Sequence, residues 1–309
     1  MKQKRFITGI LLILIIVPII SMPSLVNVFE FIMACFVIGA SIEFLNMFEK
    51  EVPLSKRFRT LTIISVLLIH ISIAGFMGFN QSTVTFENPG ILHVTIPFIL
   101  VGMFIYFVMS KNFSVTNVGK ALLVMVYVGF GSASIVLLRL IGVRFIVYML
   151  LISTLTDTFA YLIGMRFGRH KMAPKISPKK SWEGAIGGAL VATIFATLFA
   201  MYYGDIFVVG TSLGDMFNAS GERTLLDRLL MGTNISFGLQ FVFVFGLTFL
   251  ATIVSQFGDL MASKLKRHYQ IKDFGHIFPG HGGIMDRFDS VMLVSMFLSA
   301  SFFVIYLFI

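Results

Sequence analysis

Charged residues and cysteine are both scarce in this 309-residue sequence. Charged side chains make up only 13% of it, against about 25% in ordinary globular domains. Hydrophobic residues reach 57% and include 35 phenylalanines, so much of the apolar surface must face lipid rather than water. The single cysteine, Cys35, excludes an intrachain disulfide framework and any metal site built from several cysteines.

Several familiar functional motifs are also missing. The sequence contains no GxxxxGK[ST], GxGxxG or HExxH pattern, so any nucleotide must be held by another arrangement. The net charge of +9 is compatible with nucleic acid, anionic lipid or simple topology signals. The positions of the basic residues therefore decide between these readings.

Long apolar stretches dominate the chain and predict an all-α integral membrane protein with about nine transmembrane helices. Each stretch has the length that a hydrocarbon core of about 30 Å requires. We expect about five spans in an N-terminal region, 1–144, and a C-terminal catalytic region, 145–309, with polar loops at 166–183 and 258–289. The expected spans are 6–22, 26–48, 61–79, 91–109, 121–138, 145–165, 184–203, 235–257 and 290–309.

The distribution of lysine and arginine predicts the orientation. With the N-terminus inside and the C-terminus outside, 20 of the 24 basic residues fall in inside segments. This predicts a multi-pass protein of the cell membrane with both polar loops facing the cytoplasm. The first span could alternatively be a cleaved signal peptide, although no A-x-A-like site follows it. The four basic residues that fall outside are Arg139, Arg144, Arg223 and Arg228.

The polar segment 255–290 carries the strongest chemical signal. If the helix of span 235–257 continues beyond the membrane, Asp259, Ser263 and Lys266 share one of its faces. Asp286 and Asp289 stand at the start of the last helix, where the helix dipole favours carboxylates. Glycines surround a histidine between these groups, so backbone N–H groups can approach an anion. Carboxylates, basic residues and a glycine loop together suit Mg²⁺ and a polyphosphate, although a plain basic topology loop is the alternative.

This segment resembles the signature of the phosphatidate cytidylyltransferase family. The family pattern runs S-x-x-K-R, K-D, P-G-H-G-G and D-R-x-D, and every element is in register here. A second patch, S-P-K-K-S-W-E-G at 177–184, resembles the family's S-P-K-K-T-W-E-G with a serine in place of threonine. The matching residues are Ser263, Lys266, Arg267, Lys272, Asp273, Pro279, Gly280, His281, Gly282, Gly283, Asp286, Arg287 and Asp289.

A carboxylate in the middle of an apolar span is a third feature. Asp157 costs roughly 2.5–3.5 kcal/mol to insert at a helix centre, which makes it a functional candidate. Thr154, Thr158 and Tyr161 share its helix face, so we expect one polar stripe toward the bundle interior. The run T-D-T-F-A-Y at 156–161 also resembles the family's T-D-T-x-A-Y. Glu43 is a similar intramembrane carboxylate, and both helix–helix contact and site lining remain open for it.

The resemblance implies transfer of CMP from CTP to phosphatidate, giving CDP-diacylglycerol and pyrophosphate. It further implies a Mg²⁺-dependent homodimer, in which a monovalent cation such as K⁺ could share the site, and no nucleic-acid partner. We expect metal ligation by Asp259, Asp286 and Asp289. We expect substrate binding by Ser177, Lys179, Lys180, Ser263, Lys272, Gly282, Gly283 and Asp157. The catalytic residues expected are Asp259, Lys266, Arg267, His281, Asp286 and Arg287.

Two other functions remain as alternatives. A CTP-dependent lipid kinase would use the same charges but transfer the γ-phosphoryl group. An ion-coupled transporter would use Asp157 as a midplane ion site, but repeated halves and broken helices, which are common in transporters, are not evident in the sequence.

Overall fold

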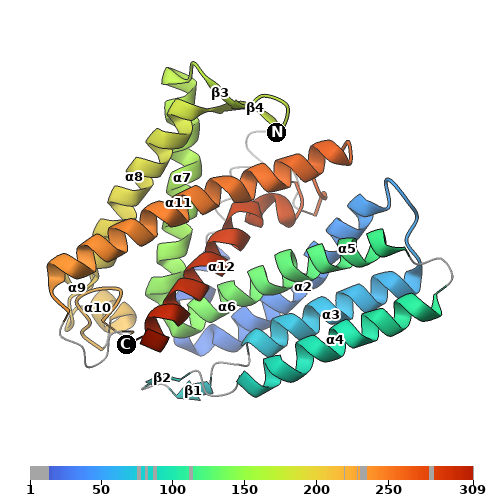
Figure 1. The fold of residues 1–309 in the computed structure, drawn as a ribbon. Coiled ribbons are helices and arrows are strands. Elements are labelled where there is room, and N and C mark those ends of the chain that lie inside the picture. The colour runs from blue at the N-terminus through green and yellow to red at the C-terminus, as the bar shows by residue number, and fades with distance from the viewer. Residues whose placement is uncertain are drawn as a thin grey trace. The chain divides into compact units, whose positions relative to one another are not determined.

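Helices account for most of the chain in a computed structural model (Figure 1). The structure describes residues 14–74, 78–80, 83–85, 89–110, 114–218, 220–227, 229, 235–277 and 282–308. The chain divides into two compact units, and each of the last two helices has residues in both. The first unit consists of Met1–Ile19, Pro23–Leu140 and Lys266–Phe288, and the second of Ile20–Met22, Ile141–Leu265 and Asp289–Ile309.

The first unit is a bundle in which α3 packs against α2, α4 and α5 (Figure 1). A π-helical turn, η2, joins α5 and α6 into one continuous helix. The ends of α11 and α12 that belong to this unit are joined through the polar segment 269–284. The elements are η1 (Pro23–Leu25), α2 (Val26–Phe48), α3 (Lys56–Ala74), β1 (Gly78–Asn80), β2 (Thr83–Thr85), α4 (Pro89–Met109), α5 (Val115–Val124), η2 (Met125–Phe130) and α6 (Gly131–Ile141).

The second unit is organised around a close pair of helices, α7 and α8, which run side by side and are linked by a β-hairpin (Figure 1). Glycines allow this approach: a Cβ on Gly184 would lie 2.5 Å from the carbonyl oxygen of Ala160, and one on Gly188 would lie 2.6 Å from the nitrogen of Ala160. Gly184 and Gly188 thus form a helix-packing motif in which small residues let two helices approach closely. The elements are α7 (Val143–Phe167), β3 (Lys171–Ala173), β4 (Ser177–Ser181), α8 (Trp182–Met201), α9 (Tyr203–Ile206), α10 (Ser212–Phe217), α11 (Phe237–His268) and α12 (Met285–Phe308).

Several helices have the length and composition to span a membrane, as the sequence composition predicts. Within the described part of the chain, six helices are long and apolar enough to cross a membrane, and Val94–Met109 is a shorter apolar helix. The prediction of an all-α membrane protein agrees with this architecture, while the count of nine spans stays a prediction. The first expected span, 6–22, lies partly outside the described residues. The six helices are Val26–Phe48, Val115–Ile141, Val143–Phe167, Trp182–Met201, Phe237–His268 and Met285–Tyr306.

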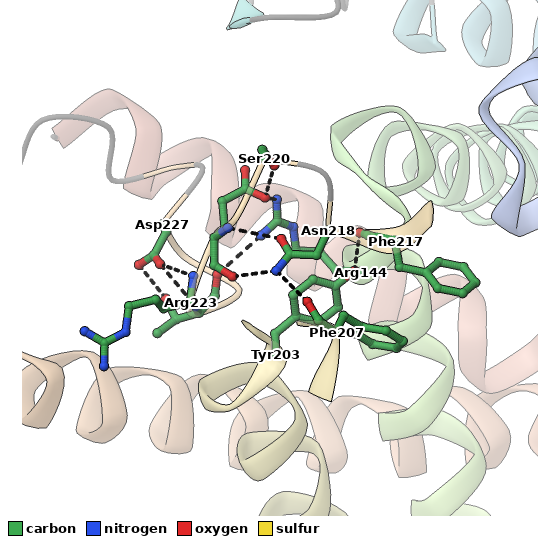
Figure 2. Close-up of polar contacts among 10 residues, drawn as sticks. Arg144, Tyr203, Phe207, Phe217, Asn218, Ser220, Arg223 and Asp227 are labelled. Atoms are coloured by element: carbon green, nitrogen blue, oxygen red, sulfur yellow. Dashed lines mark hydrogen bonds and ion pairs between the residues drawn. The ribbon is translucent and has the colours of Figure 1, made fainter. Parts of the chain in front are cut away.

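The segment that follows α8 is anchored by a buried ion pair in the second unit (Figure 2). Arg144, at the start of α7, is only 4% exposed and pairs with Glu222, whose side chain is 14% exposed. The guanidinium also lies 5.2 Å from the ring centroid of Tyr203. The hydroxyl of Tyr203 donates to the carbonyl of Phe217 at 2.6 Å. Arg144 is thus a structural residue, which explains why it departs from the charge pattern of the loops.

Candidate active site

The lysine patch of segment 177–184 lies on a short hairpin that is fixed to the start of α8. Strand β4 pairs with β3 in antiparallel orientation and ends at Ser181, whose hydroxyl accepts the N–H of Gly184 at 3.2 Å. This is an N-cap, which satisfies one of the free donors of the first helical turn. The local fold therefore holds the two lysines at a helix N-terminus, a position that favours anions.

A carboxylate in the same motif ties the hairpin to the end of α7. Glu183 accepts the backbone N–H groups of Arg169, at 3.1 Å, and His170, at 3.2 Å. Its Oε1 also lies 2.6 Å from Nδ1 of His170. Sequence reasoning assigned no role to Glu183. Its place inside the lysine motif is the signal that could have found it.

Lys180 contacts the carboxylate of a distant helix. Its Nζ lies 2.5 Å from Oδ2 of Asp259 on α11, and the two side chains are 24% and 29% exposed. Ser263, one turn further along α11, donates to Oδ1 of Asp259 at 3.5 Å. Lys179 is exposed on the same strand. The prediction that α11 continues past its apolar part, with Asp259, Ser263 and Lys266 spaced along it, is confirmed by its end at His268.

Asp157 joins this group from α7. Its Oδ2 accepts the hydroxyl of Ser290 at 3.1 Å, and Ser290 also bonds to Ser153 at 2.8 Å. The charges of Asp259 and Lys180 both act on the Asp157 carboxyl. The second unit therefore brings together two carboxylates, an ammonium and several hydroxyls from α7, β4, α11 and α12. We call Asp157, Lys180, Asp259 and Ser263 the acidic–lysine cluster.

The polar stripe expected on α7 is accessible, and from it Asp157 reaches Ser290 of α12. Thr154, Asp157, Thr158 and Tyr161 share a face, but all four are exposed, whereas the packed face carries Tyr148, Ile152 and other buried side chains. The reason is that the glycine-rich contact with α8 and the packing of α7 use the remaining faces of the helix. The polar stripe is accessible from outside the packed core, which suits a substrate-binding surface more than a buried structural one.

Asp286 lies in the first unit, where its carboxylate is buried and accepts three hydrogen bonds. Its side chain is 4% exposed, and its Oδ1 accepts from Nζ of Lys266 at 2.8 Å. Its Oδ2 accepts the backbone N–H groups of Phe274, at 2.8 Å, and Gly283, at 3.0 Å. Three donors on one carboxylate fix its orientation. Asp286 and Asp259 belong to different units, so a metal shared by them stays a prediction.

The other residues singled out by the sequence lie in varied surroundings. Arg267, Lys272 and Arg287 are exposed. Asp289 accepts the N–H of Ser290 at 2.9 Å. Gly282 adopts a positive φ of 87°, which explains the requirement for glycine there. Ser177 begins β4, and His281 falls outside the described residues.

The acidic–lysine cluster is chemically suited to a divalent cation. Mg²⁺ takes one or two protein carboxylates and completes its octahedron with water and phosphate oxygens. Asp157 and Asp259, with the hydroxyl of Ser263 beside them, supply such a partial set. Across the described ranges, no group of three or more His, Cys, Asp or Glu side chains forms a complete protein cage. The donor set therefore fits an ion that shares its coordination with a phosphate.

Fold and site together define a multi-pass helical membrane protein that gathers lysine and carboxylate side chains in its second unit. The sequence profile of the cytidylyltransferase family matches residues 3–306. The chain therefore belongs to the cytidylyltransferase family.

Relatives from staphylococci agree with this assignment. The phosphatidate cytidylyltransferase of Staphylococcus haemolyticus (strain JCSC1435) is 31% identical over 295 residues, which cover 94% of this chain and 95% of the relative. The protein of the same name from Staphylococcus epidermidis (strain ATCC 12228 / FDA PCI 1200) is 30% identical with the same coverage. The one from Staphylococcus aureus (strain COL) is 34% identical over 190 residues, and that match spans 61% of each chain.

Proposed function

We propose that this protein is a phosphatidate cytidylyltransferase, which forms CDP-diacylglycerol and pyrophosphate from CTP and phosphatidate. An oxygen of the phosphatidate phosphate attacks the α-phosphorus of CTP. The bond from that phosphorus to the oxygen bridging the α- and β-phosphates breaks, and pyrophosphate leaves. The observation that carries the proposal is the acidic–lysine cluster, because it assembles two of the family's motifs and Asp157 around one group of charges.

The chemistry requires little proton transfer. The phosphatidate oxygen is already ionised near neutral pH, so the barrier lies in bringing two polyanions together and releasing pyrophosphate. Lys179 and Lys180 would neutralise phosphate oxygens as point charges. Bound Mg²⁺ would supply charge neutralisation at the phosphates, and Asp259 with Asp157 would hold it.

The first unit contributes a second group of charges to the proposal. Lys266, held against Asp286, and the exposed Arg267 and Arg287 are suited to the pyrophosphate or the lipid phosphate. Ser177, Lys272 and Gly282 would complete the substrate contacts. The N–H of Gly283 already donates to Asp286, so its contribution would be to hold that carboxylate rather than to bind an anion directly.

Location and assembly follow from the same reasoning. We propose nine spans with the N-terminus inside, an active site on the cytoplasmic side of the cell membrane, and a homodimer as the working form. The positions of 20 of 24 basic residues support the orientation, and the family resemblance supports the dimer.

A direct assay tests the proposed activity. Purified protein in detergent is mixed with CTP, phosphatidate and Mg²⁺, and both CDP-lipid and pyrophosphate are measured. We expect both products in equal amounts, and neither when CTP or phosphatidate is omitted. Diacylglycerol in place of phosphatidate is the matched control, because it lacks the attacking phosphate. Equal turnover with diacylglycerol would contradict the proposal.

A further inference from the structure

A buried glutamate from a different part of the first unit contacts the start of the last helix. Glu43 lies on α2 and is 4% exposed. Its two oxygens accept the backbone N–H groups of Ile284 and Met285, each at 2.9 Å. These are unpaired donors at the start of α12, which begins at Met285. A carboxylate there is favoured both by the hydrogen bonds and by the helix dipole.

Two glycines that precede α12, Gly275 and Gly283, lie directly against the same carboxylate. A Cβ added to Gly275 would lie 2.1 Å from Oε1 of Glu43, and its three nearest atoms all belong to that side chain. A Cβ added to Gly283 would lie 2.5 Å from Oε1 of Glu43 and 2.6 Å from the backbone nitrogen of Gly275. Glycine at both positions is thus explained by the need to leave room for Glu43.

This contact leads directly to Asp286. The two backbone donors that hold Oδ2 of Asp286 belong to Phe274, which precedes Gly275, and to Gly283 itself. Phe274 also stacks on Phe44 of α2, with ring centroids 5.2 Å apart. The orientation of the Asp286 carboxylate therefore depends on where α2 holds Phe274 and Gly283.

We infer that Glu43 is a positioning residue of the active site: from α2 it fixes the start of α12 together with Gly275 and Gly283, and so orients Asp286. The inference rests on the proposed function, because it assigns Glu43 a part in the use of Asp286 for transfer. Glu43 contacts protein groups, not substrate, so its loss acts through Asp286. A purely structural glutamate would instead affect folding and leave the turnover of folded protein unchanged.

Substitution by glutamine separates these possibilities. Glu43→Gln keeps the shape but offers one acceptor oxygen to two N–H groups. We expect kcat to fall about 10- to 100-fold, the range typical when a partner of an active-site ligand is lost. We expect the KM for CTP to remain nearly unchanged, because uniform substrate binding is not affected. Glu30→Gln, the same change on the same helix, is the matched control and should leave both constants unchanged.

Hydrogen exchange tests the positioning without turnover. Amides of 282–290 should exchange faster in Glu43→Gln than in the wild type and in Glu30→Gln, while α8 keeps its protection. Unchanged exchange at 282–290, or a kcat equal to that of Glu30→Gln, would overturn the inference. Absence of transfer by the wild-type protein would instead overturn the proposed function. The exchange measurement would still test whether Glu43 holds the start of α12.

A pair of glycine variants gives an independent check. Gly275→Ala should lower the thermal unfolding midpoint when Glu43 is present, but should cause no further loss in a Glu43→Ala background, because the three atoms nearest to its added Cβ all belong to that side chain. Gly283→Ala should remain harmful in both backgrounds, because its Cβ also meets backbone. Additive losses for Glu43 and Gly275 would contradict the proposed arrangement.

Discussion

The contact between Lys180 and Asp259 predicts that replacing Lys180 reduces activity more than replacing the adjacent Lys179. Lys180 lies 2.5 Å from Asp259, and both side chains are less than one third exposed. Lys179 is exposed on the opposite face of the strand. We therefore compare Lys180→Met with Lys179→Met, which remove the same charge and keep a similar side-chain length.

The expected magnitudes follow from these environments. A hydrogen bond to a charged group in a partly buried site is worth about 1.5–3 kcal/mol. We propose that Lys180 donates such a bond to a CTP phosphate, so Lys180→Met should lose roughly 10- to 150-fold in kcat/KM. An exposed charge contributes about 0–1 kcal/mol, so Lys179→Met should cost at most about fivefold. We expect its effect mainly in the KM for CTP, since an ammonium contacts ground-state and transition-state phosphates alike.

The assay is steady-state CDP-lipid formation with CTP varied at saturating phosphatidate. The wild type and both variants are compared after equal expression and equal thermal stability have been confirmed. Equal losses in the two variants, or a larger loss for Lys179→Met, would refute the reasoning. A double variant with an unchanged KM for CTP would show that the whole hairpin acts only as a topology signal.

Three other predictions concern the buried ion pair, the aspartates and the topology. Glu222→Gln should destabilise the protein by about 3–5 kcal/mol, because it leaves Arg144 buried without a counter-charge; thermal unfolding measures this. Asp259→Asn should abolish most activity, shift the Mg²⁺ titration and leave folding intact, whereas Asp286→Asn should also lower stability, because three donors lose their charged acceptor. A cysteine placed at Lys175 should react with reagents from the inside, and one placed at Ser220 with reagents from the outside.

The ion-pair prediction has a control in the chain. Arg223→Met removes an exposed charge near the same ion pair and should change stability by no more than about 0.5 kcal/mol. Cys35 is exposed and must be replaced before the labelling experiment. A Mg²⁺ titration of Asp259→Asn that matches the wild type, labelling of the two introduced cysteines from the same side, or a stable Glu222→Gln protein would each contradict its prediction.

The sequence was sufficient to predict features that depend on local order. Apolar length predicted the helices, and the i, i+4 and i+7 spacing correctly placed Asp259, Ser263 and Lys266 along one continuous helix. The start of α12 at Met285 likewise agrees with the placement of Asp286 in a first helical turn.

Contacts across long stretches of sequence could not be predicted in the same way. Nothing in a single sequence pairs Lys180 with Asp259, or Glu43 with the N–H groups that precede Asp286. Glu43 showed only the general signal of a carboxylate in an apolar span. Periodicity identified the polar face of Asp157, but it did not indicate that close packing against α8 would leave that face exposed.

The central claim is transfer of a cytidylyl group to a lipid phosphate, and positional labelling of CTP tests it most directly. Purified protein is given phosphatidate and Mg²⁺ with CTP labelled either at the α- or at the γ-phosphate. We predict that the α-label enters the lipid and the γ-label appears only in pyrophosphate. Both labelled products should be strongly reduced with Asp259→Asn. Entry of the γ-label into lipid would identify a lipid kinase. A folded wild-type protein that transfers no label to lipid would contradict the proposed function.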